Sequence, residues 1–124
     1  MRILESAENY LKTIHKLHQE KGNVRSVDIA NALHFSKASV SVAMKNLREN
    51  GYIQVESSGN IVLLDKGREI AEHVYDRHMT VTKLLQSFGV EEEMAKEDAC
   101  GIEHILHEET FQNIKNFLEK QGKL

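Results

Sequence analysis

Three side chains that bind metal ions well lie near the carboxyl end of the sequence, in the pattern Cys100-x-x-Glu103-His104. Because an α-helix turns by about 100° per residue, this spacing places all three on one helical face. A thiolate, a carboxylate and an imidazole suit Fe(II), Mn(II), Zn(II) or Co(II) better than Ca(II) or Mg(II), which prefer oxygen ligands alone. His78, in an earlier helical stretch, can add another nitrogen. A lone Cys or His is more often structural, so the prediction of a metal site rests on three ligand types sharing one face.

A second group of side chains has the types that contact DNA. The recognition helix of a helix-turn-helix places short polar side chains in the major groove, and basic residues further along reach the phosphates. A hairpin next to such a helix can contact the flanking backbone. The DNA-contacting residues that we expect are Ser36, Lys37, Ser39, Ser41, Lys45 and Arg48 on the helix, and Ser57 and Ser58 at the hairpin tip.

Three helices are predicted before the hairpin. Apolar residues recur at three- and four-residue spacing over residues 7–18, and Gly22 ends that helix. Ser26 is the expected N-cap of a short second helix, which His34 and Phe35 interrupt. Ser36 then caps the third helix, which Asn50-Gly51 terminates. Two short helices joined by a tight turn form the first half of a helix-turn-helix.

The rest of the chain completes a winged domain and adds helices. Residues 52–56 and 61–64 alternate as strands around a turn at residues 57–60, which predicts a β-hairpin wing. A long helix follows Gly67 and ends near Gly89, another begins at the acidic run 91–93 and continues to about Ile105, and a last one covers residues 111–118. We therefore expect a mainly α fold. It has a winged helix-turn-helix DNA-binding domain in residues 1–66 and a linker helix with a metal-binding and dimerisation domain in residues 67–124.

The composition is that of an ordinary soluble protein, with 40% hydrophobic and 28% charged residues in 124. Its charge is uneven: residues 1–70 hold ten Lys and Arg against eight Asp and Glu (+2), whereas residues 71–124 hold six against eleven (−5). This asymmetry suits a phosphate-facing half joined to a cation-facing half. No apolar run reaches the roughly 20 residues of a membrane helix, and residues 1–5 do not begin a secretory signal, so we expect the cytoplasm. The single cysteine, Cys100, cannot form an internal disulfide.

The sequence resembles the diphtheria-toxin-repressor family of iron- and manganese-dependent regulators, in the short, manganese-repressor-like form without a third, C-terminal domain. The resemblance covers nearly the whole chain, and its most specific motifs are Arg77-His78 and Cys100-x-x-Glu103-His104. It also includes the runs Glu8-Asn9-Tyr10-Leu11-Lys12-x-Ile14, Ser39-Val40-Ser41 and Leu64-x-x-x-Gly67. The resemblance implies a DNA-binding homodimer. It further implies that metal is bound by His78, Cys100, Glu103 and His104, together with first-helix residues at the positions of Asn9 and Lys12.

The first-helix positions depart from the family pattern. Manganese-type members carry carboxylates at both, and iron-type members carry methionine at the first. Asn9 can offer a carbonyl oxygen, whereas protonated Lys12 cannot bind a cation and repels it. Thr82 and Lys96 also stand where iron-type members have a carboxylate and a histidine in a second site. We therefore expect one metal ion per subunit, held by Cys100, Glu103, His104 and His78, or by the first three with Asn9.

Spare ligands and the identity of the metal remain open at this level. Glu8, next to Asn9, and His107, close to the face of the metal pattern, are further candidates. Glu8 and Lys12 are four residues apart, so an ordinary helical ion pair also explains both. The Cys100 thiolate favours Fe(II) or Zn(II) over Mn(II).

These features predict a metal-responsive transcriptional regulator, a repressor of metal-uptake genes activated by Fe(II) or Mn(II), with Zn(II) or Co(II) as alternative cofactors. Its partners would be a double-stranded DNA operator and a second copy of itself, with no membrane and no small-molecule substrate. Metal would favour the DNA-competent dimer, whose recognition helices lie about one DNA turn apart. The alternatives are a winged-helix regulator without metal control, a metal-binding helical protein without DNA binding, and a protein-binding adaptor. We expect no enzyme, because the sequence has no phosphate loop or nucleophile elbow.

Overall fold

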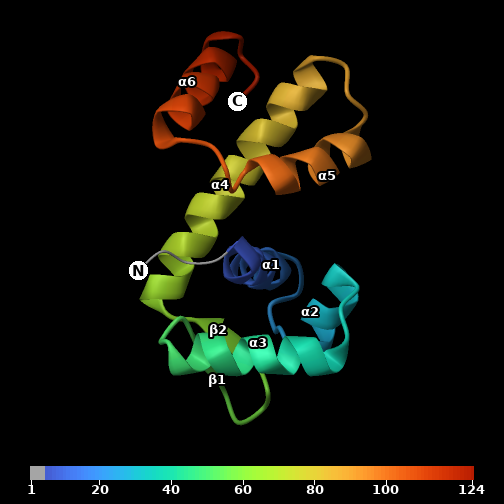
Figure 1. Ribbon diagram of the computed structural model, residues 1–124, viewed down its shortest axis with the longest axis vertical. Helices are drawn as coiled ribbons and strands as arrows, with labels where there is room; N and C mark the ends of the chain where they lie inside the picture. Colours follow the sequence, from blue (N-terminus) through green and yellow to red (C-terminus); the bar gives the residue numbers. More distant parts are fainter. Residues whose placement is uncertain (1–4) are drawn as a thin grey trace. The chain divides into compact units, whose positions relative to one another are not determined.

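The structure is a computed structural model that describes residues 5–124; residues 1–4, on which most of the expectation about a secretory signal rested, lie outside them. Its elements are α1 (Glu5–Lys21), α2 (Ser26–Leu33), α3 (Lys37–Glu49), β1 (Ile53–Val55), β2 (Ile61–Leu63), α4 (Asp65–Ser87), α5 (Glu92–Ile102) and α6 (Glu108–Lys120) (Figure 1). The predicted mainly helical fold, with three helices and a hairpin before the remaining helices, is confirmed. The chain divides into two compact units, residues 1–73 and 74–124. The predicted domain boundary at residue 66 stays a prediction, since α4 belongs to both units.

The start of α2 differs from the expectation. The N-cap residue is Arg25 and not Ser26, because the Asp28 carboxylate accepts a hydrogen bond from the Arg25 backbone N–H at 2.9 Å. Lys21 Nζ also lies 2.6 Å from Asp28 Oδ1. The hydrogen bonds from Lys21 and from the Arg25 backbone hold the pKa of Asp28 below its ordinary value. At the other end, His34 adopts the left-handed conformation, with φ of 59°, and stops the helix as expected.

Helix α3 is capped as the sequence predicts. Ser36 Oγ accepts a hydrogen bond from the Ser39 backbone N–H at 3.1 Å, which satisfies one of the free donors of the first turn. Gly51 follows the helix with φ of 78°, a conformation that side chains with a Cβ rarely adopt. The buried side chains of α3 are Val40, Met44 and Leu47. The helix therefore turns its opposite face to solvent.

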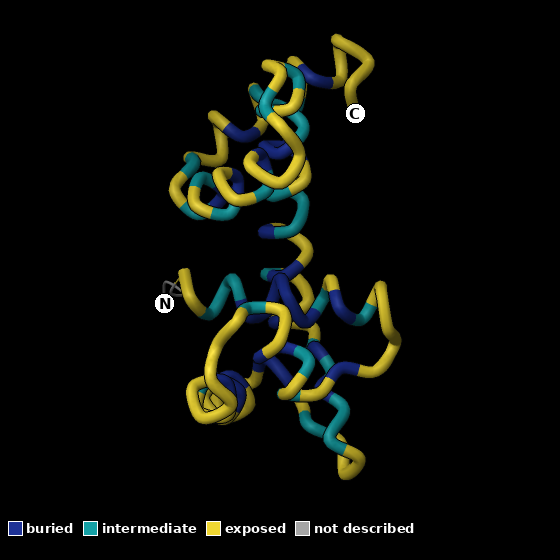
Figure 2. The backbone as a smooth tube through the Cα atoms, turned by 90° about the vertical axis from the view of Figure 1, so that its right-hand side faces the viewer, coloured by how far each residue is buried: buried dark blue, intermediate teal, exposed yellow. Residues whose placement is uncertain are grey.

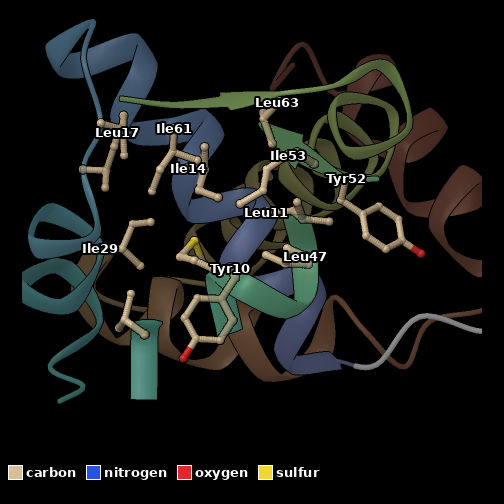
Figure 3. Close-up of a cluster of buried hydrophobic side chains, with 14 of the residues drawn as sticks. Tyr10, Leu11, Ile14, Leu17, Ile29, Leu47, Tyr52, Ile53, Ile61 and Leu63 are labelled. Atoms are coloured by element: carbon tan, nitrogen blue, oxygen red, sulfur yellow. The ribbon is translucent and has the colours of Figure 1, made fainter. Parts of the chain in front are cut away.

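The core of the first unit is built where α1, α2, α3 and the hairpin meet (Figure 3). Leu11 and Ile14 of α1 are fully buried and lie beside Ile53 and Ile61 of the two strands. Strands β1 and β2 pair antiparallel, with Ile53 opposite Leu63 and Val55 opposite Ile61. Burying the apolar face of α1 against both strands gives the wing a fixed base.

The wing is also tied to the connection between α1 and α2. The Asn60 side-chain oxygen accepts from the Val24 backbone N–H at 2.8 Å, and the Ile61 N–H donates to the Val24 carbonyl at 2.7 Å. Asn60 Nδ2 donates to Glu56 Oε1 at 2.9 Å across the turn. Asn60 therefore holds the turn in place.

Gly67 explains the glycine of the Leu64-x-x-x-Gly67 motif. A Cβ at this position would collide with the Tyr52 carbonyl oxygen and touch Leu11. The same carbonyl accepts a hydrogen bond from the Leu64 N–H at 3.0 Å. Because backbone and not a flexible side chain fills the space, only glycine lets α4 begin this close to β1.

The second unit comprises the later part of α4 with α5 and α6, and buried residues recur on each helix (Figure 2). Its buried apolar side chains are Val74, Val81, Ala95, Ala99, Phe111 and Leu118. Helix α5 ends at Ile102, three residues before the expected Ile105, and residues 103–105 form a turn. Among residues 5–124, no helix is long and apolar enough to cross a membrane.

Candidate metal centre and nucleic-acid interface

Glu103 lies at the centre of the candidate metal site. Its side chain has no solvent exposure, which is costly for a carboxylate without polar partners. His78 Nδ1, on α4, lies 2.8 Å from Glu103 Oε2, and His104 Nε2 lies 3.3 Å from Glu103 Oε1. The His104 side chain is itself only 3% exposed. The second unit thus brings together a buried carboxylate and two imidazoles, from positions 78, 103 and 104.

The nitrogen and oxygen donors are of the types that bind a transition-metal ion. In the structure, however, these side chains contact one another as hydrogen-bond partners. Two atoms bound at about 2.1 Å to a tetrahedral metal lie about 3.4 Å apart, close to the 3.3 Å between His104 Nε2 and Glu103 Oε1. The 2.8 Å contact between His78 Nδ1 and Glu103 Oε2 is a hydrogen bond, which a metal bound at Nδ1 would have to replace. Within residues 5–124, no group of three His, Cys, Asp or Glu side chains already surrounds a common point. The residues are therefore of the types that bind such a metal, but their side chains would have to move to bind it.

Cys100 occupies the last turn of α5 and is half-buried. The expectation that Cys100, Glu103 and His104 share one helical segment is wrong in detail, because α5 ends at Ile102. Glu103 nevertheless keeps a helical backbone, with φ of −57° and ψ of −25°, and its N–H donates to the Ala99 carbonyl at 2.9 Å. His104 lies in the turn that follows the helix. Participation of the thiol in metal binding stays a prediction.

Arg77 fixes the segment that follows α5. Its Nη1 donates to the backbone carbonyls of Glu103 at 3.3 Å and of Leu106 at 2.6 Å, and its Nη2 pairs with Glu108 Oε2 at 2.9 Å. The guanidinium also lies 5.2 Å from the centre of the Phe111 ring. One buried side chain thus binds the end of α5, the connection and the start of α6. Arg77 is the neighbour of His78 in the chain. One turn of α4 therefore holds the segment after α5 and also carries a histidine of the candidate site.

Arg77 had no expected role beyond its place in the Arg77-His78 motif, although the sequence contains a signal for one. The buried stripe of α4 runs through Ala71, Val74 and Val81, and its three- and four-residue spacing requires a buried position at 77 or 78. Arg77 and His78 are the residues at these two places in the stripe. Two polar residues that interrupt an apolar stripe must find partners inside the protein, which is the observation that could have identified Arg77.

The remaining metal candidates lie elsewhere. Asn9 and Glu8 are half-buried on α1, in the first unit, and their role as ligands stays a prediction. Lys12 is buried, with 8% exposure. The spare candidate His107 is exposed just before α6. Thr82 and Lys96, which stand where iron-type members have second-site ligands, make other contacts: Thr82 donates to the His78 carbonyl at 2.7 Å and Lys96 pairs with Glu92 at 3.3 Å.

All of the expected DNA-contacting residues are exposed in the first unit. They are Ser36, Lys37, Ser39, Ser41, Lys45 and Arg48 along α3, and Ser57 and Ser58 in the turn between the strands. Ser36 Oγ donates to Ser39 Oγ at 2.9 Å, so these two hydroxyls are engaged in the cap. Ser41, Lys45 and Arg48 follow on the exposed surface of the helix. This surface has the composition of a recognition helix.

Comparison with known proteins agrees with both halves of this description. Residues 2–60 match the sequence model of the N-terminal DNA-binding domain of iron-dependent repressors, and residues 64–122 match the metal-binding and dimerisation domain of the same proteins. The chain belongs to the iron-dependent repressor family. The resemblance inferred from the motifs is thereby confirmed, and the chain is a metal-dependent transcriptional regulator by family. Its relatives are transcriptional regulators and not enzymes.

Curated relatives match most of the length of this chain. The chain is 33% identical over 118 residues to an HTH-type transcriptional regulator of Methanocaldococcus jannaschii, covering 94% of both chains. It is also 33% identical over 114 residues to the HTH-type transcriptional regulator MntR of Bacillus subtilis, covering 92% of this chain and 80% of the relative.

Solved structures of the family share the fold. The T. acidophilum IdeR structure has a TM-score of 0.81 at 28% identity and covers 98% of this chain. A manganese-dependent transcriptional repressor in complex with manganese has a TM-score of 0.82 at 25% identity and covers 91% of this chain. This chain spans 56% and 52% of those two solved chains.

Proposed function

We propose that this iron-dependent repressor homologue represses metal-uptake genes when Fe(II) or Mn(II) occupies a site built on Glu103. The observation that carries the proposal is the fully buried Glu103 carboxylate between His78 and His104. A buried, charged group with two imidazole neighbours provides nitrogen and oxygen donors in one place. An ordinary structural ion pair would need only one of the two histidines.

His78, Glu103 and His104 would hold the metal, with Cys100 as the fourth ligand. When bound, the metal supplies a cross-link between α4, which carries His78, and the turn after α5, which carries the other two. Arg77 already fixes that turn through the Glu103 and Leu106 carbonyls. Metal binding would therefore stiffen the second unit at the turn that Arg77 already holds. One metal ion per subunit is expected from these residues.

The first unit supplies the support for DNA as the partner. Helix α3 exposes Lys37, Lys45 and Arg48, and its one acidic residue, Glu49, is its last. Positive charge along an exposed recognition helix attracts the phosphates of DNA. Binding that depends on this attraction weakens steeply as the salt concentration rises. A double-stranded operator is therefore the proposed ligand of this face, and the cytoplasm, where the chromosome lies, is the proposed location.

The second unit supplies the support for a homodimer. It exposes six large apolar side chains, which are Met79, Phe88, Met94, Ile105, Phe117 and Leu124. Exposed apolar side chains that gather into one patch mark surfaces that bind another protein. The matched family domain is described as a dimerisation domain. A dimer would present two recognition helices to half-sites about one DNA turn apart.

The alternative of a regulator without metal control has one observation in its favour. Lys12 is buried on α1 at a position where manganese-type members carry a carboxylate. A fixed ammonium can take the place of a second metal ion, which would leave the protein partly independent of metal. This alternative predicts tight operator binding after treatment with a chelator.

The experiment combines metal analysis with DNA binding. Duplexes selected from a random pool with Mn(II) or anaerobic Fe(II) are titrated with wild type, Glu103→Gln and Glu109→Gln, since Glu109 is an exposed acid of α6. We expect one metal per subunit and roughly 5- to 150-fold tighter DNA binding with metal, the usual range of allosteric coupling. Glu103→Gln should lose both properties and Glu109→Gln should keep both. Unchanged duplex affinity on metal addition would refute the proposal.

A further inference from the structure

Val42 is the most exposed of the large apolar side chains in the described part of the first unit, at 61%. It lies on α3, two residues after the buried Val40, so the two side chains leave about 200° apart around the helix. Val42 therefore points away from the core of its own unit. The caps, hairpin contacts and core packing of the unit do not account for a valine there.

The neighbours of Val42 form a small apolar spot within a basic, polar surface. Ala38, one turn earlier, is exposed and lies about 40° from Val42 around the helix axis. Lys45, one turn later, is exposed and lies about 60° away. Ser39 and Ser41 flank the spot on either side. The surface thus combines methyl groups in its middle with donors and a positive charge at its edge.

The chemistry of this surface matches one feature of the major groove. Thymine is the base that presents a methyl group there, at C5, and it is contacted by small apolar side chains, whereas guanine, adenine and cytosine present hydrogen-bonding groups. Val42 can make no hydrogen bond with its side chain. A polar base edge facing it would be desolvated without a partner.

We propose that Val42, supported by Ala38, reads the C5-methyl group of a thymine in each operator half-site. This inference rests on the proposed DNA-binding function and adds which base the exposed apolar spot of α3 recognises. Lys37, Lys45 and Arg48 hold the helix in the groove through phosphates, and the valine then selects thymine by apolar contact.

The test removes the methyl group from either side of the contact. In the selected duplex, each thymine pair related by the half-site symmetry is replaced by deoxyuridine, which lacks only the C5-methyl group. Affinities are measured by fluorescence anisotropy at one salt concentration for wild type, Val42→Ala and Val27→Ala. Val27 is the control because it is also an exposed valine, but on α2.

For wild type we expect one thymine pair whose replacement weakens binding by about fourfold per half-site, the usual effect of one buried methyl group. In Val42→Ala, the same deoxyuridine replacement should lower the logarithm of the affinity by less than about half as much as in wild type. The reason is that the protein substitution and the base replacement remove the same contact. Val27→Ala should respond like wild type. Equal sensitivity of wild type and Val42→Ala, or no sensitive thymine, would overturn the inference while leaving DNA binding intact. Failure to select any duplex would overturn the proposed function as well.

Discussion

Replacing Arg77 with methionine should destabilise the second unit and weaken metal binding together. Methionine has similar length and fills the apolar part of the space, so the change removes the hydrogen bonds with little loss of packing. The carbonyls of Glu103 and Leu106 then lose the Nη1 donor, and the Glu108 carboxylate loses Nη2. The segment that carries the proposed ligands is left without its anchor to α4.

The magnitude follows from the burial of the groups concerned. A buried acceptor left without a partner costs about 1–3 kcal/mol, and two carbonyls are affected. Part of this is offset because a buried guanidinium, whose Nε has no acceptor among the described residues, no longer has to be desolvated. The net loss in the free energy of unfolding should be about 1–3 kcal/mol. Metal affinity should fall by about 10- to 100-fold, as when outer groups that orient ligands are removed.

Arg68→Met is the matched control. Arg68 also lies on α4 and also contacts one carboxylate and one carbonyl, Asp65 Oδ1 at 3.1 Å and Leu63 O at 3.2 Å. Its side chain is 50% exposed, whereas that of Arg77 is 10% exposed. Water can replace the lost contacts at Arg68, so its loss should cost less than about 1 kcal/mol and leave metal affinity unchanged.

Both variants are compared by urea denaturation of the metal-free protein and by isothermal titration with Mn(II). Titrating Arg77→Lys as well separates charge from geometry, since a lysine keeps the charge but cannot reach three acceptors in fixed directions. If Arg77→Met bound Mn(II) within twofold of wild type, the idea that this side chain positions the metal ligands would be refuted.

Four further substitutions have expected outcomes. Gly67→Ala should destabilise the protein by about 1–3 kcal/mol, because the new Cβ would collide with the backbone. Gly101→Ala, with open space inside α5, should instead stabilise the protein by about 0.5–1 kcal/mol. Urea denaturation of both variants tests the sign of each change. The lowered pKa of Asp28 gives a stability contribution that is complete above the ordinary value of 3.8 and is lost as pH falls below it. Asp28→Asn should therefore cost less than about 1 kcal/mol at pH 7, the usual range for an exposed ion pair, and flatten the acid limb of a stability–pH curve; a limb as steep as in wild type would contradict this. Lys12→Glu should raise the metal stoichiometry measured by calorimetry above that of wild type, and an unchanged stoichiometry would count against a role for Lys12 in place of metal.

The order and approximate limits of the elements follow from the sequence because they depend on neighbours within a few residues. Ser36 as a cap, His34 and Gly51 as helix ends, and the paired strands of the wing are all local features. One of the two errors is local as well. Ser26 and Asp28 both offer an oxygen near the same helix start, and Lys21, seven residues before the aspartate, favours the second. The early end of α5 at Ile102 accompanies the carbonyl contacts made by a distant arginine.

The order of the residues specifies which chemical groups are present and which of them are neighbours along a helix, as in Cys100-x-x-Glu103-His104 and in the exposed face of α3. The packing of the helices specifies that Glu103 is fully buried, that His78 contacts it from 25 residues away, and that Arg77 holds its carbonyl. The two differ because spacing sets only the direction of a side chain relative to its own helix. Burial and partners depend instead on which other helix packs against that face, and a charged group is retained inside only where such a partner meets it.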